Sequence, residues 1–270
     1  MNVSVVLPSF NRARLLPITI PTYFQEDVSE VILVDDCSSD NTAEVVKELQ
    51  TRFPTLRYFR NEVNSKQPYT QNVAISKVQS EYIYFGDDDS VLYPGSIRNL
   101  LNVMREKNAD IVGGRALALF FPEQIDELDE FLSHYRNRIA TEANQIVDLS
   151  TLSTNFTYTV KEPIRVPFCH ASCLCKTQVA REMQFDVKIE GNAYREETDF
   201  LIRATLAGYT IYYTSSANQI NLPSAMCPEE HAVRIIDIGL KMPFATMIIS
   251  LTRIMIVCRK CLVCLVPKMK

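Results

Sequence analysis

The N-terminal part of the chain alternates short hydrophobic runs with segments in which hydrophobic residues recur at helical spacing. The short runs, which predict buried strands, are Val3–Leu7, Val31–Val34, Leu56–Phe59 and Tyr82–Phe85. The segments with helical spacing are Arg12–Phe24, which Pro17 and Pro21 would kink or shorten, Asn41–Phe53 and Gln71–Val78. Such an alternation predicts a parallel sheet with helices on both faces.

Three polar clusters directly follow three of these predicted strands. They are Ser9–Arg12, Asp35–Asp40 and Asp87–Asp89. In open α/β sheets the carboxyl ends of parallel strands lie at one edge, and ligands bind there. The sequence therefore predicts a ligand site at this edge.

The second half of the chain is less regular. The elements expected there are a strand at Ala109–Gly113, a charged helix at Glu123–Ile139, extended or looped chain at Gln145–Pro167, a helix with an acidic first turn at Arg195–Ala207 and a short strand at Tyr209–Tyr213. No repeat or Ser/Gly linker divides the 270 residues, so one large domain is expected.

Charge and cysteine content limit the classes of partner. The 28 Lys and Arg residues against 32 Asp and Glu give a net charge of −4, which argues against a nucleic-acid partner. The run Met1–Pro8 lacks a basic region and ends at proline, so it is read as a strand rather than a signal peptide. A cytoplasmic protein is therefore expected, and its 8 cysteines are read as thiols.

The triplet Asp87–Asp89 crowds negative charge at a strand end. Carboxylates this close raise one another's pKa or recruit a cation. Oxygen-only ligands suit Mg²⁺ or Mn²⁺, ions that commonly bridge a diphosphate. A solvated acidic turn that caps the next helix through Asp89 or Ser90 is the alternative.

A second acidic group, Asp35 and Asp36, follows the second predicted strand. A carboxylate here could accept the ring N–H of a pyrimidine or hold a ribose hydroxyl. The alternative is a local Asx-turn with helix capping by Asp40. The chain has no Gly-x-Gly-x-x-Gly after its first strand and no Gly-x4-Gly-Lys-Ser/Thr, which weakens dinucleotide-oxidoreductase and P-loop interpretations.

Taken in order, several segments resemble the family 2 glycosyltransferases. They are Val5–Arg12, Val31–Thr42, Tyr82–Asp89, Ala109–Arg115, Phe185–Asp186 and Tyr194–Tyr209, and the similarity covers about residues 1–220. The resemblance implies the α/β fold called GT-A, which is Rossmann-like. We accordingly expect a mostly parallel central sheet with helices on both faces and a nucleotide-diphospho-sugar site.

The resemblance also implies roles on the nucleotide side of the site. Pro8, Phe10 and Asn11 would line the nucleotide pocket. Asp35 or Asp36 would contact the base.

Further roles concern the diphosphate and the cation. Asp87 and Asp89 stand at the family's Asp-x-Asp, so Asp87 and Asp88 would contact the donor, while Asp89 with Asp87 would bind Mn²⁺ or Mg²⁺. Where the family often has Ala-Arg-Asn, this chain has Thr70-Gln71-Asn72, which leaves Lys66 as the nearest cation for the diphosphate.

The family's acidic base motif aligns with Glu196, Glu197 and Asp199, and Glu197 replaces the usual Asp. Either Glu197 or Asp199 is then the base that accepts the proton of the acceptor hydroxyl. Many members carry a metal-binding His shortly after the last strand. The nearest downstream histidine here is His231, for which a surface or core role is the alternative.

The cysteines form two groups. The first, Cys169-His170-x2-Cys173-x-Cys175, has zinc-ligand chemistry without the paired spacing of most structural sites, so buried packing is the preferred interpretation. The second, Cys258-x2-Cys261-x2-Cys264, lacks the fourth Cys of a ferredoxin cluster. Helix packing is preferred for it, with membrane-proximal acylation as the alternative.

The expected domain organisation is a glycosyltransferase domain over residues 1–240 and a tail over 241–270. Within the domain, residues 1–115 would bind the donor and 116–240 the acceptor. The hydrophobic tail is interrupted by Arg253, Arg259 and Lys260, which would share one side of a helix. This pattern predicts an amphipathic helix in the membrane interface, with a packed helix or a homodimer contact as alternatives.

The sequence thus predicts a metal-dependent, inverting glycosyltransferase of the hexosyltransferase type at the inner face of a membrane. It would transfer a sugar from a nucleotide-diphosphate sugar, with UDP the preferred nucleotide, to a hydroxyl of a glycan or lipid-linked acceptor. One alternative is a non-catalytic nucleotide-sugar-binding or scaffolding member of a membrane glycan assembly. The other is a sugar-phosphate nucleotidyltransferase, although the chain lacks that class's Gly-rich phosphate loop after the first strand.

Overall fold

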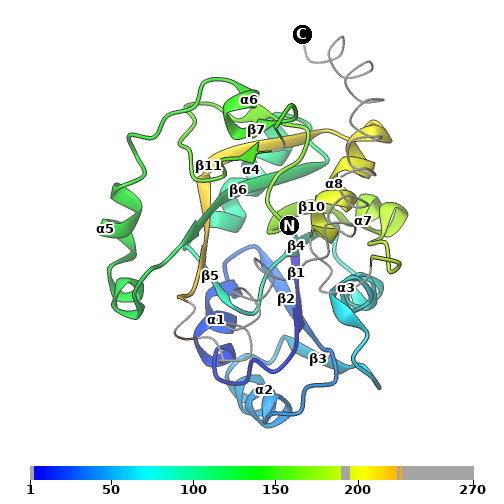
Figure 1. Ribbon diagram of the computed structural model, residues 1–270. Helices are drawn as coiled ribbons and strands as arrows, with labels where there is room; N and C mark the ends of the chain where they lie inside the picture. Colours follow the sequence, from blue (N-terminus) through cyan, green and yellow to red (C-terminus); the bar gives the residue numbers. More distant parts are fainter. Residues whose placement is uncertain (1–2, 152, 190–194, 224–225, 227–270) are drawn as a thin grey trace.

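The computed structural model of the chain describes residues 3–151, 153–189, 195–223 and 226 (Figure 1). His231, the predicted C-terminal helix and the second cysteine group lie outside these residues. Within the described ranges, no helix has the length and hydrophobicity needed to cross a bilayer.

The described residues form one large sheet, one small sheet and helices. The large sheet contains β1 (Val3–Ser9), β2 (Val28–Asp35), β3 (Leu56–Arg60), β4 (Tyr82–Phe85), β5 (Ser90–Leu92), β6 (Ile111–Ala118), β9 (Ile164–Arg165), β10 (Cys173–Lys176) and β11 (Ile211–Asn221). The small sheet pairs β7 (Val147–Asp148) with β8 (Ser153–Thr154). The helices are α1 (Leu16–Tyr23), α2 (Thr42–Arg52), α3 (Lys66–Lys77), α4 (Ser96–Glu106), η1 (Pro122–Glu127), α5 (Leu128–Ser133), α6 (Ala143–Ile146), α7 (Thr177–Met183) and α8 (Glu196–Leu206).

The large sheet has the order β3-β2-β1-β4-β10-β6-β11-β5, and β9 pairs with β11. Its N-terminal strands β1 to β4 are parallel, as the sequence predicts. Strand β10, however, is antiparallel to both of its neighbours, and β11 is antiparallel to β5 and β9. The GT-A architecture is confirmed, but the sheet is mixed because the chain returns to its centre through β10.

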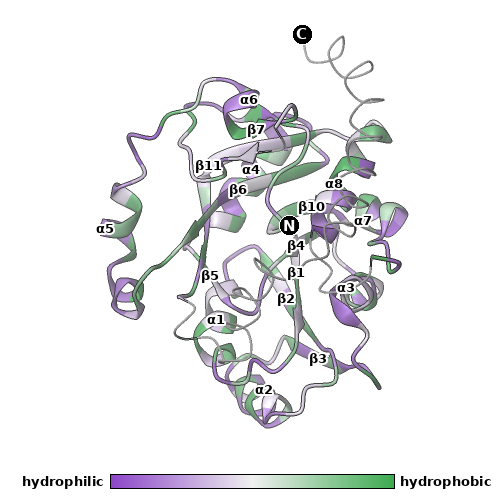
Figure 2. Ribbon diagram, viewed as in Figure 1, coloured by the Kyte–Doolittle hydropathy of each residue, from purple (hydrophilic) through white to green (hydrophobic). Residues whose placement is uncertain are grey.

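Hydrophobic alternation in the central strands builds a core on each face of the sheet. In β1, Val5 and Leu7 pack against residues of α1, α2 and α4, whereas Val6 packs against α3, α7 and α8. Hydrophobic and hydrophilic residues alternate around α2 and α3, as expected of helices that cover a sheet (Figure 2). The predicted helices on both faces are confirmed.

Two of the elements that follow β6 differ from the sequence expectation. The single helix expected at Glu123–Ile139 is replaced by η1, by α5 and by turns that follow Ser133. Phe131 and Leu132 are buried against the ends of β6 and β11, while most side chains after them are exposed, so no hydrophobic face supports a longer helix. The short strand expected at Tyr209–Tyr213 extends as β11 to Asn221.

A close approach at Gly86 positions the acidic triplet. A Cβ on Gly86 would lie 2.7 Å from Leu7 Cδ2 and 2.9 Å from Tyr23 Cε1, so only glycine fits between these side chains. The Tyr23 hydroxyl then donates to the carbonyl oxygen of Asp87 at 2.8 Å. Helix α1 thereby supports the loop that follows β4.

Candidate functional site

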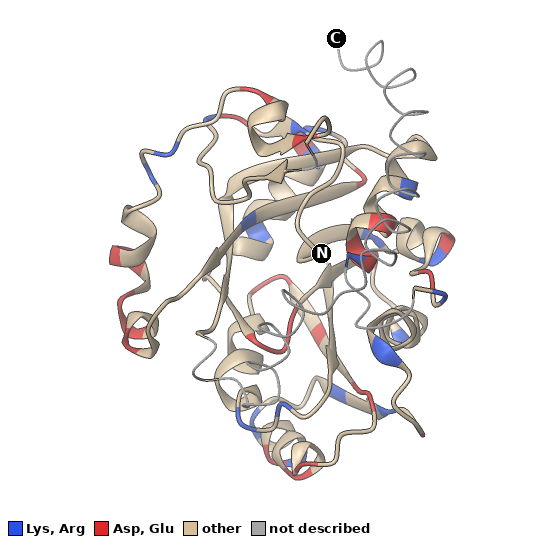
Figure 3. Ribbon diagram, in the orientation of Figure 1, with Lys and Arg blue, Asp and Glu red and all other residues tan. Residues whose placement is uncertain are grey.

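The three polar clusters lie together at the carboxyl edge of the parallel strands, as predicted. Asp36 N donates to Ser9 O at 2.8 Å, which joins the ends of β1 and β2. Gly86 N donates to Val6 O at 3.0 Å, which joins the ends of β1 and β4. Acidic residues of the loops and of α8 are coloured red in Figure 3.

The loop after β1 is hydrogen-bonded to the loop after β2. Asn11 has a φ of 54°, its N–H donates to Ser38 Oγ at 2.8 Å, and its Oδ1 accepts from Ser39 N at 2.8 Å. Asp40 accepts from Ala13 N at 3.0 Å and from Thr42 N in the first turn of α2 at 3.1 Å. The N-cap residue of α2 is Asn41, so Asp40 forms an Asx-turn one residue before the cap. These bonds fix Asn11 at the edge of the predicted nucleotide pocket.

Pro8 and Phe10, the other residues assigned to the nucleotide pocket, flank Ser9 at the end of β1 and are half-buried. The part-exposed ring of Phe10 is therefore available to pack against a planar base. Their role in nucleotide binding stays a prediction.

The carboxylate of Asp35 is fully buried and already has protein partners. Its Oδ2 accepts from the Tyr58 hydroxyl at 2.7 Å and from Arg60 Nη1 at 2.8 Å, and its Oδ1 accepts from Ser38 N at 2.8 Å. Burial, and then the hydrogen bond to Asp35, raise the pKa of Tyr58 to about 12. A base N–H could reach this carboxylate only if Arg60, whose side chain is 41% exposed, moved aside.

The carboxylate of Asp36 organises the start of α3. Its Oδ1 accepts from Asn61 Nδ2 and Ser65 N, both at 2.8 Å, and its Oδ2 accepts from Lys66 N at 2.8 Å. Lys66 has a φ of 72° and begins α3. The side chain of Asp36 therefore places Lys66 at the sheet edge, where the resemblance requires a cation.

Arg12 holds two members of the acidic triplet. Its Nε lies 3.3 Å from Asp88 Oδ1 and its Nη2 lies 3.4 Å from Asp89 Oδ2. Burial raises the pKa of Asp88 to about 7, opposed by the charge of Arg12 and reinforced by Asp89. Burial and the charge of Asp87 likewise raise the pKa of Asp89.

Asp87 is bound by residues from the second half of the chain. Its Oδ2 accepts from Ser172 Oγ at 2.8 Å and from Gln219 Nε2 at 2.6 Å. Gln219 is itself fixed, because its Oε1 accepts from the buried Tyr84 hydroxyl at 2.8 Å. The sheet-edge triplet is thus attached to the segment before β10 and to β11.

The acidic triplet fits a divalent cation that a donor diphosphate completes. Within the described residues, no three His, Cys, Asp or Glu side chains could hold a metal ion by themselves. Mg²⁺ commonly needs only one or two protein carboxylates, because phosphate oxygens and water fill its other positions. Asp87 is half-buried and the side chain of Asp89 is 33% exposed, so both can contribute an oxygen to such an ion.

The start of α8 brings a second pair of carboxyl groups to the same edge. Burial raises the pKa of Glu196 to about 9, helped by the charge of Glu197, by a hydrogen bond with Glu197 and by the charge of Asp87. Glu196 is therefore neutral near pH 7 and can donate to the half-buried Glu197. Asp199 instead accepts from Arg203 Nε at 2.7 Å.

The structure brings most of the predicted site residues to one edge and adds several that the sequence analysis missed. Ser172 and Gln219 carry no local signal, since their partner Asp87 is 85 and 132 residues away in the chain. Tyr23 is missed because helical spacing identifies it only as a buried position. Arg12 belongs to the segment Val5–Arg12 that resembles the family, but its contact with the acidic triplet is evident only in the folded structure.

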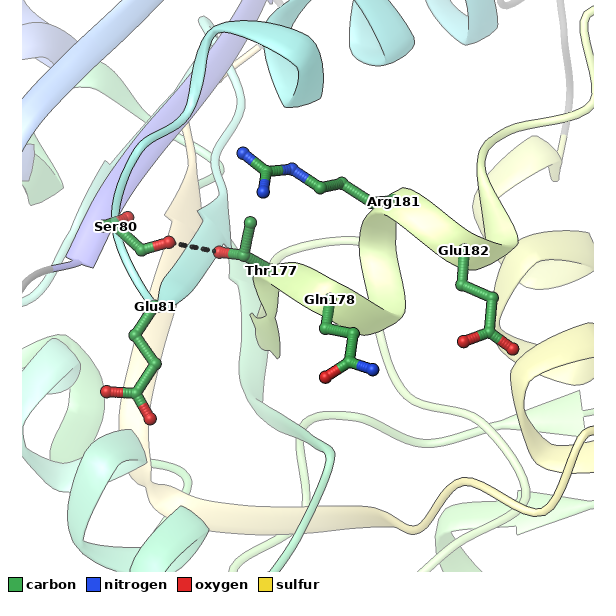
Figure 4. A pocket seen from close by; sticks show the side chains of 6 residues that line it. All are labelled: Ser80, Glu81, Thr177, Gln178, Arg181 and Glu182. Carbon is green, nitrogen blue, oxygen red and sulfur yellow. Dashed lines mark hydrogen bonds between the residues drawn. The ribbon is translucent and has the colours of Figure 1, made fainter.

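Two cavities lie at different edges of the sheet. One, of about 500 Å³, lies at the amino end of β4 and is lined by Ser80, Glu81, Thr177, Gln178, Arg181 and Glu182 (Figure 4). It is remote from the strand ends that carry the triplet. The other, of about 450 Å³, is lined by residues of β6, by His170 and by Asn221, and it adjoins the triplet.

The first cysteine group packs in the core, as its preferred interpretation predicts. Cys169, Cys173 and Cys175 are all buried free thiols. A hydrogen bond that the Cys173 thiol donates to Cys169, together with burial, raises the pKa of Cys173 well above its usual value.

Comparison with known proteins identifies relatives over part of the chain. A glucosyltransferase of Campylobacter jejuni, the GalNAc(5)-diNAcBac-PP-undecaprenol beta-1,3-glucosyltransferase, is 33% identical over 114 residues, covering 41% of this chain and 37% of that protein. The poly(ribitol-phosphate) beta-N-acetylglucosaminyltransferase TarP of Staphylococcus aureus is 32% identical over 121 residues, covering 42% of this chain and 36% of that protein. The matched segment thus spans little more than a third of each relative.

Solved structures share the fold at low sequence identity. Staphylococcus aureus TarS 1–349 in complex with UDP has a TM-score of 0.58 and 19% identity, covering 82% of this chain and 60% of that one. A mannosyltransferase of Pyrobaculum calidifontis in complex with GDP-Man and Mn²⁺ has a TM-score of 0.57 and 18% identity, covering 86% and 59%. The family described as glycosyl transferase family 2 matches residues 4–173, which is more than half of the chain. The chain therefore belongs to glycosyl transferase family 2.

Proposed function

We propose that the protein is an inverting, metal-dependent glycosyltransferase that moves a sugar from a UDP-sugar to an acceptor hydroxyl. The observation that carries the proposal is the packing of β4 against α8, in which the rings of Phe85 and Phe200 lie edge to face with their centroids 5.8 Å apart. This packing brings Asp87, two residues after Phe85, close to Glu196, and the charge of Asp87 helps to raise the pKa of Glu196. This proximity puts the carboxylates expected to hold the donor and those expected to take the acceptor proton at one edge of the sheet.

The donor side is built by β1, β2 and β4. Asp87 and Asp89 would hold a Mn²⁺ or Mg²⁺ ion, and such an ion would neutralise the charge that develops on the leaving diphosphate. Lys66, at the start of α3, would add a cation for the same group. If Asp35 accepts the uracil ring N–H, UDP binds more tightly than CDP.

On the acceptor side, Glu197 would accept the proton of the attacking hydroxyl. An inverting displacement needs a carboxylate near that hydroxyl, opposite the leaving diphosphate. Glu197 receives the hydrogen bond of neutral Glu196, which orients it without neutralising it. Asp199 is less suited, because its carboxylate already pairs with Arg203.

The acceptor we propose is a glycan or a lipid-linked glycan. This proposal rests on the relatives, whose names refer to an undecaprenol-diphosphate-linked saccharide and to poly(ribitol phosphate). A lipid-linked acceptor would suit the tail predicted from the sequence, because Arg253, Arg259 and Lys260 would face anionic headgroups of the membrane.

The proposal is tested by donor hydrolysis, which needs no knowledge of the acceptor. The protein is incubated with UDP-, GDP-, dTDP- and CMP-sugars, with Mn²⁺ or with excess chelator, and nucleotide release is measured. We expect Mn²⁺-dependent release from a UDP-sugar that Asp89→Ala abolishes without changing the thermal unfolding midpoint. Undiminished release in chelator, or binding of UDP-sugars with no turnover of any donor or acceptor, would contradict it.

A further inference from the structure

The cavity beside the acidic triplet is lined by side chains of a different chemical kind from those of the rest of the site. It holds about 450 Å³ between the ends of β6 and β11 and the segment that follows α5. Its lining includes Arg138, His170, Asn155 and Asn221 and contains no carboxylate. An acidic donor site therefore adjoins a cavity whose own ionisable groups are basic.

Three arginines are concentrated at this cavity. Arg138 lines it, with its guanidinium 5.0 Å from the ring centre of Tyr135. Arg115 is buried behind the wall on β6, and both its burial and the nearby charge of Arg136 lower its pKa. Within the described part of the chain, none of the three forms an ion pair with a carboxylate. The nearby acidic residues do not line the cavity; they lie on η1 and α5 and at Glu142 and Asp148.

Hydrogen bonds fix the side chain of Arg115 and connect it to the backbone of Arg138. Arg115 Nε donates to Asn218 Oδ1 at 2.7 Å, and its Nη1 donates to Thr159 Oγ1 at 3.3 Å. Thr159 Oγ1 in turn donates to Tyr135 O at 2.9 Å, and Thr159 N donates to Arg138 O at 2.7 Å. A buried, positively charged side chain thus anchors the segment that carries Arg138.

His170 adds a hydrogen-bond donor to the same cavity. Its Nδ1 accepts from Ser172 N at 3.2 Å, so in the neutral ring the proton lies on Nε2. The ring also lies edge-on to Phe156, with centroids 6.0 Å apart. The Nε2–H group can therefore donate to an anionic oxygen in the cavity.

The cavity is directly connected to the donor carboxylates. Ser172, whose N–H binds His170, donates its hydroxyl to Asp87. On the other side, Asn221 lines the cavity and accepts from Ser90 Oγ at 3.1 Å, and the next residue, Leu222, donates to Asp89 O at 2.9 Å. A group bound in the cavity would lie next to the sugar that is transferred.

We infer that this cavity binds a phosphate group of the acceptor, close to the hydroxyl that receives the sugar. The inference rests on the proposed function and narrows its acceptor to one that carries a phosphodiester or diphosphate. Arg138 and the Nε2–H of His170 supply hydrogen-bond donors for phosphate oxygens, and Arg115 and Arg136 add positive charge behind them. The same chemistry is available in a polyol-phosphate chain and in a lipid diphosphate.

The test measures binding of phosphate-bearing probes to the full chain with UDP present. The probes are a ribitol-phosphate oligomer and a farnesyl-diphosphate-linked monosaccharide, each compared by calorimetry with its phosphate-free counterpart. We expect at least one phosphate probe to bind about tenfold more tightly than its counterpart. Arg138→Ala should remove most of this difference, and Arg138→Lys should retain part of it.

Arg52 provides a matched control, because it is also exposed and lies 5.5 Å from an aromatic ring centre, that of Phe53 on the opposite part of the molecule. Arg52→Ala should leave the phosphate preference unchanged. Among the described residues, the Arg138 side chain lies over the Tyr135 ring and forms no hydrogen bond or ion pair, so its loss should not unfold the protein.

Each result has a definite consequence. Preference for either phosphate probe that depends on Arg138 supports the inference and identifies the source of the phosphate. Equal binding of phosphate and phosphate-free probes, or an unchanged preference in Arg138→Ala, overturns it. Donor hydrolysis is measured in parallel. Hydrolysis without a preference for the phosphate probes refutes only the phosphate-binding role of the cavity. A preference for the phosphate probes without hydrolysis refutes only the proposed function.

Discussion

Asp199 and Arg203, one turn apart on α8, form an ion pair in which Arg203 Nε donates to Asp199 Oδ2 at 2.7 Å. Arg203 also donates to the carbonyl oxygens of Met183 and Gln184, both at 2.6 Å, so the pair joins α8 to the end of α7. The carboxylate of Asp199 therefore already has a cationic partner, whereas the salt bridges of the described residues include none of Glu197.

The first prediction separates these two carboxylates. Glu197→Gln should lower the turnover of donor by about 10²–10⁴-fold, because a general base contributes that much, and should leave donor affinity unchanged. Asp199→Asn should lower thermal stability and retain most of the turnover. Steady-state kinetics with thermal unfolding of both variants checks this, and a crippled but stable Asp199→Asn would reverse the two roles.

A second prediction concerns the partners of Asp87. Ser172→Ala removes a hydrogen bond that holds the Asp87 carboxylate, and a hydrogen bond to a charged group contributes about 1.5–3 kcal/mol. We expect the Mn²⁺ concentration for half-maximal donor hydrolysis to rise roughly tenfold, with the maximal rate less affected.

Tyr84→Phe supplies a graded comparison for this prediction. It removes only the hydroxyl that holds Gln219, one step further from Asp87. Its effect on the Mn²⁺ requirement should have the same direction and be smaller. An unchanged Mn²⁺ requirement in Ser172→Ala would show that this contact does not position Asp87 for the cation.

The third prediction concerns the stability supplied by Asp36. Asp36→Ala leaves Asn61 Nδ2, Ser65 N and Lys66 N without their acceptor, and an unpaired buried donor costs about 1–3 kcal/mol. We expect the free energy of unfolding in urea to fall by about 2 kcal/mol or more. Asp36→Asn retains one oxygen acceptor, so its free energy of unfolding should lie between those of the wild type and Asp36→Ala. Wild-type stability in Asp36→Ala would contradict this role.

The fourth prediction uses the raised pKa of Glu196. Folded Glu196 keeps its proton to about pH 9, whereas an unfolded glutamate loses it near pH 4.5. Between these values the unfolded state binds fewer protons, so this group makes the free energy of unfolding fall as pH rises, by at most about 1.4 kcal/mol per pH unit. The contribution is fully present below pH 4.5.

Glu196→Gln removes this titration and keeps a hydrogen-bond donor for Glu197. The free energy of unfolding is measured in urea for this variant and for the wild type. The value of the variant minus that of the wild type should therefore increase steadily from pH 5 to pH 8.5. A difference that is constant over this range would show that Glu196 is ionised in the folded protein.

The parallel half of the fold follows from the sequence because each of its strands contains a short hydrophobic run, and three of the four runs are followed by a polar cluster. Strand β10 has no such signature, because α7 begins at Thr177, directly after Cys173–Lys176, and no polar cluster separates them. Its pairing with β4 and β6 is fixed only by tertiary packing. Helix α4 has a strong amphipathic pattern, and its buried residues include Ile97, Leu100, Leu101 and Met104. The sequence alone could therefore have predicted this helix.

Some features of the candidate site could likewise be predicted from the sequence, and others could not. The acidic clusters are contiguous in the chain, so their place at the strand ends could be predicted. Contacts such as that of Gln219 with Asp87 join residues that are far apart in the sequence, and no local pattern encodes them. The neutral state of Glu196 likewise depends on burial that only the packed start of α8 provides.

The most direct test of the central claim is the configuration of the sugar released from an α-linked UDP-sugar. With Mg²⁺ and a high concentration of enzyme, proton NMR can follow the anomeric signals before the released sugar equilibrates. Attack from the face opposite the diphosphate, assisted by Glu197, predicts that the β-anomer forms first. Initial release of the α-anomer would contradict an inverting mechanism at this site.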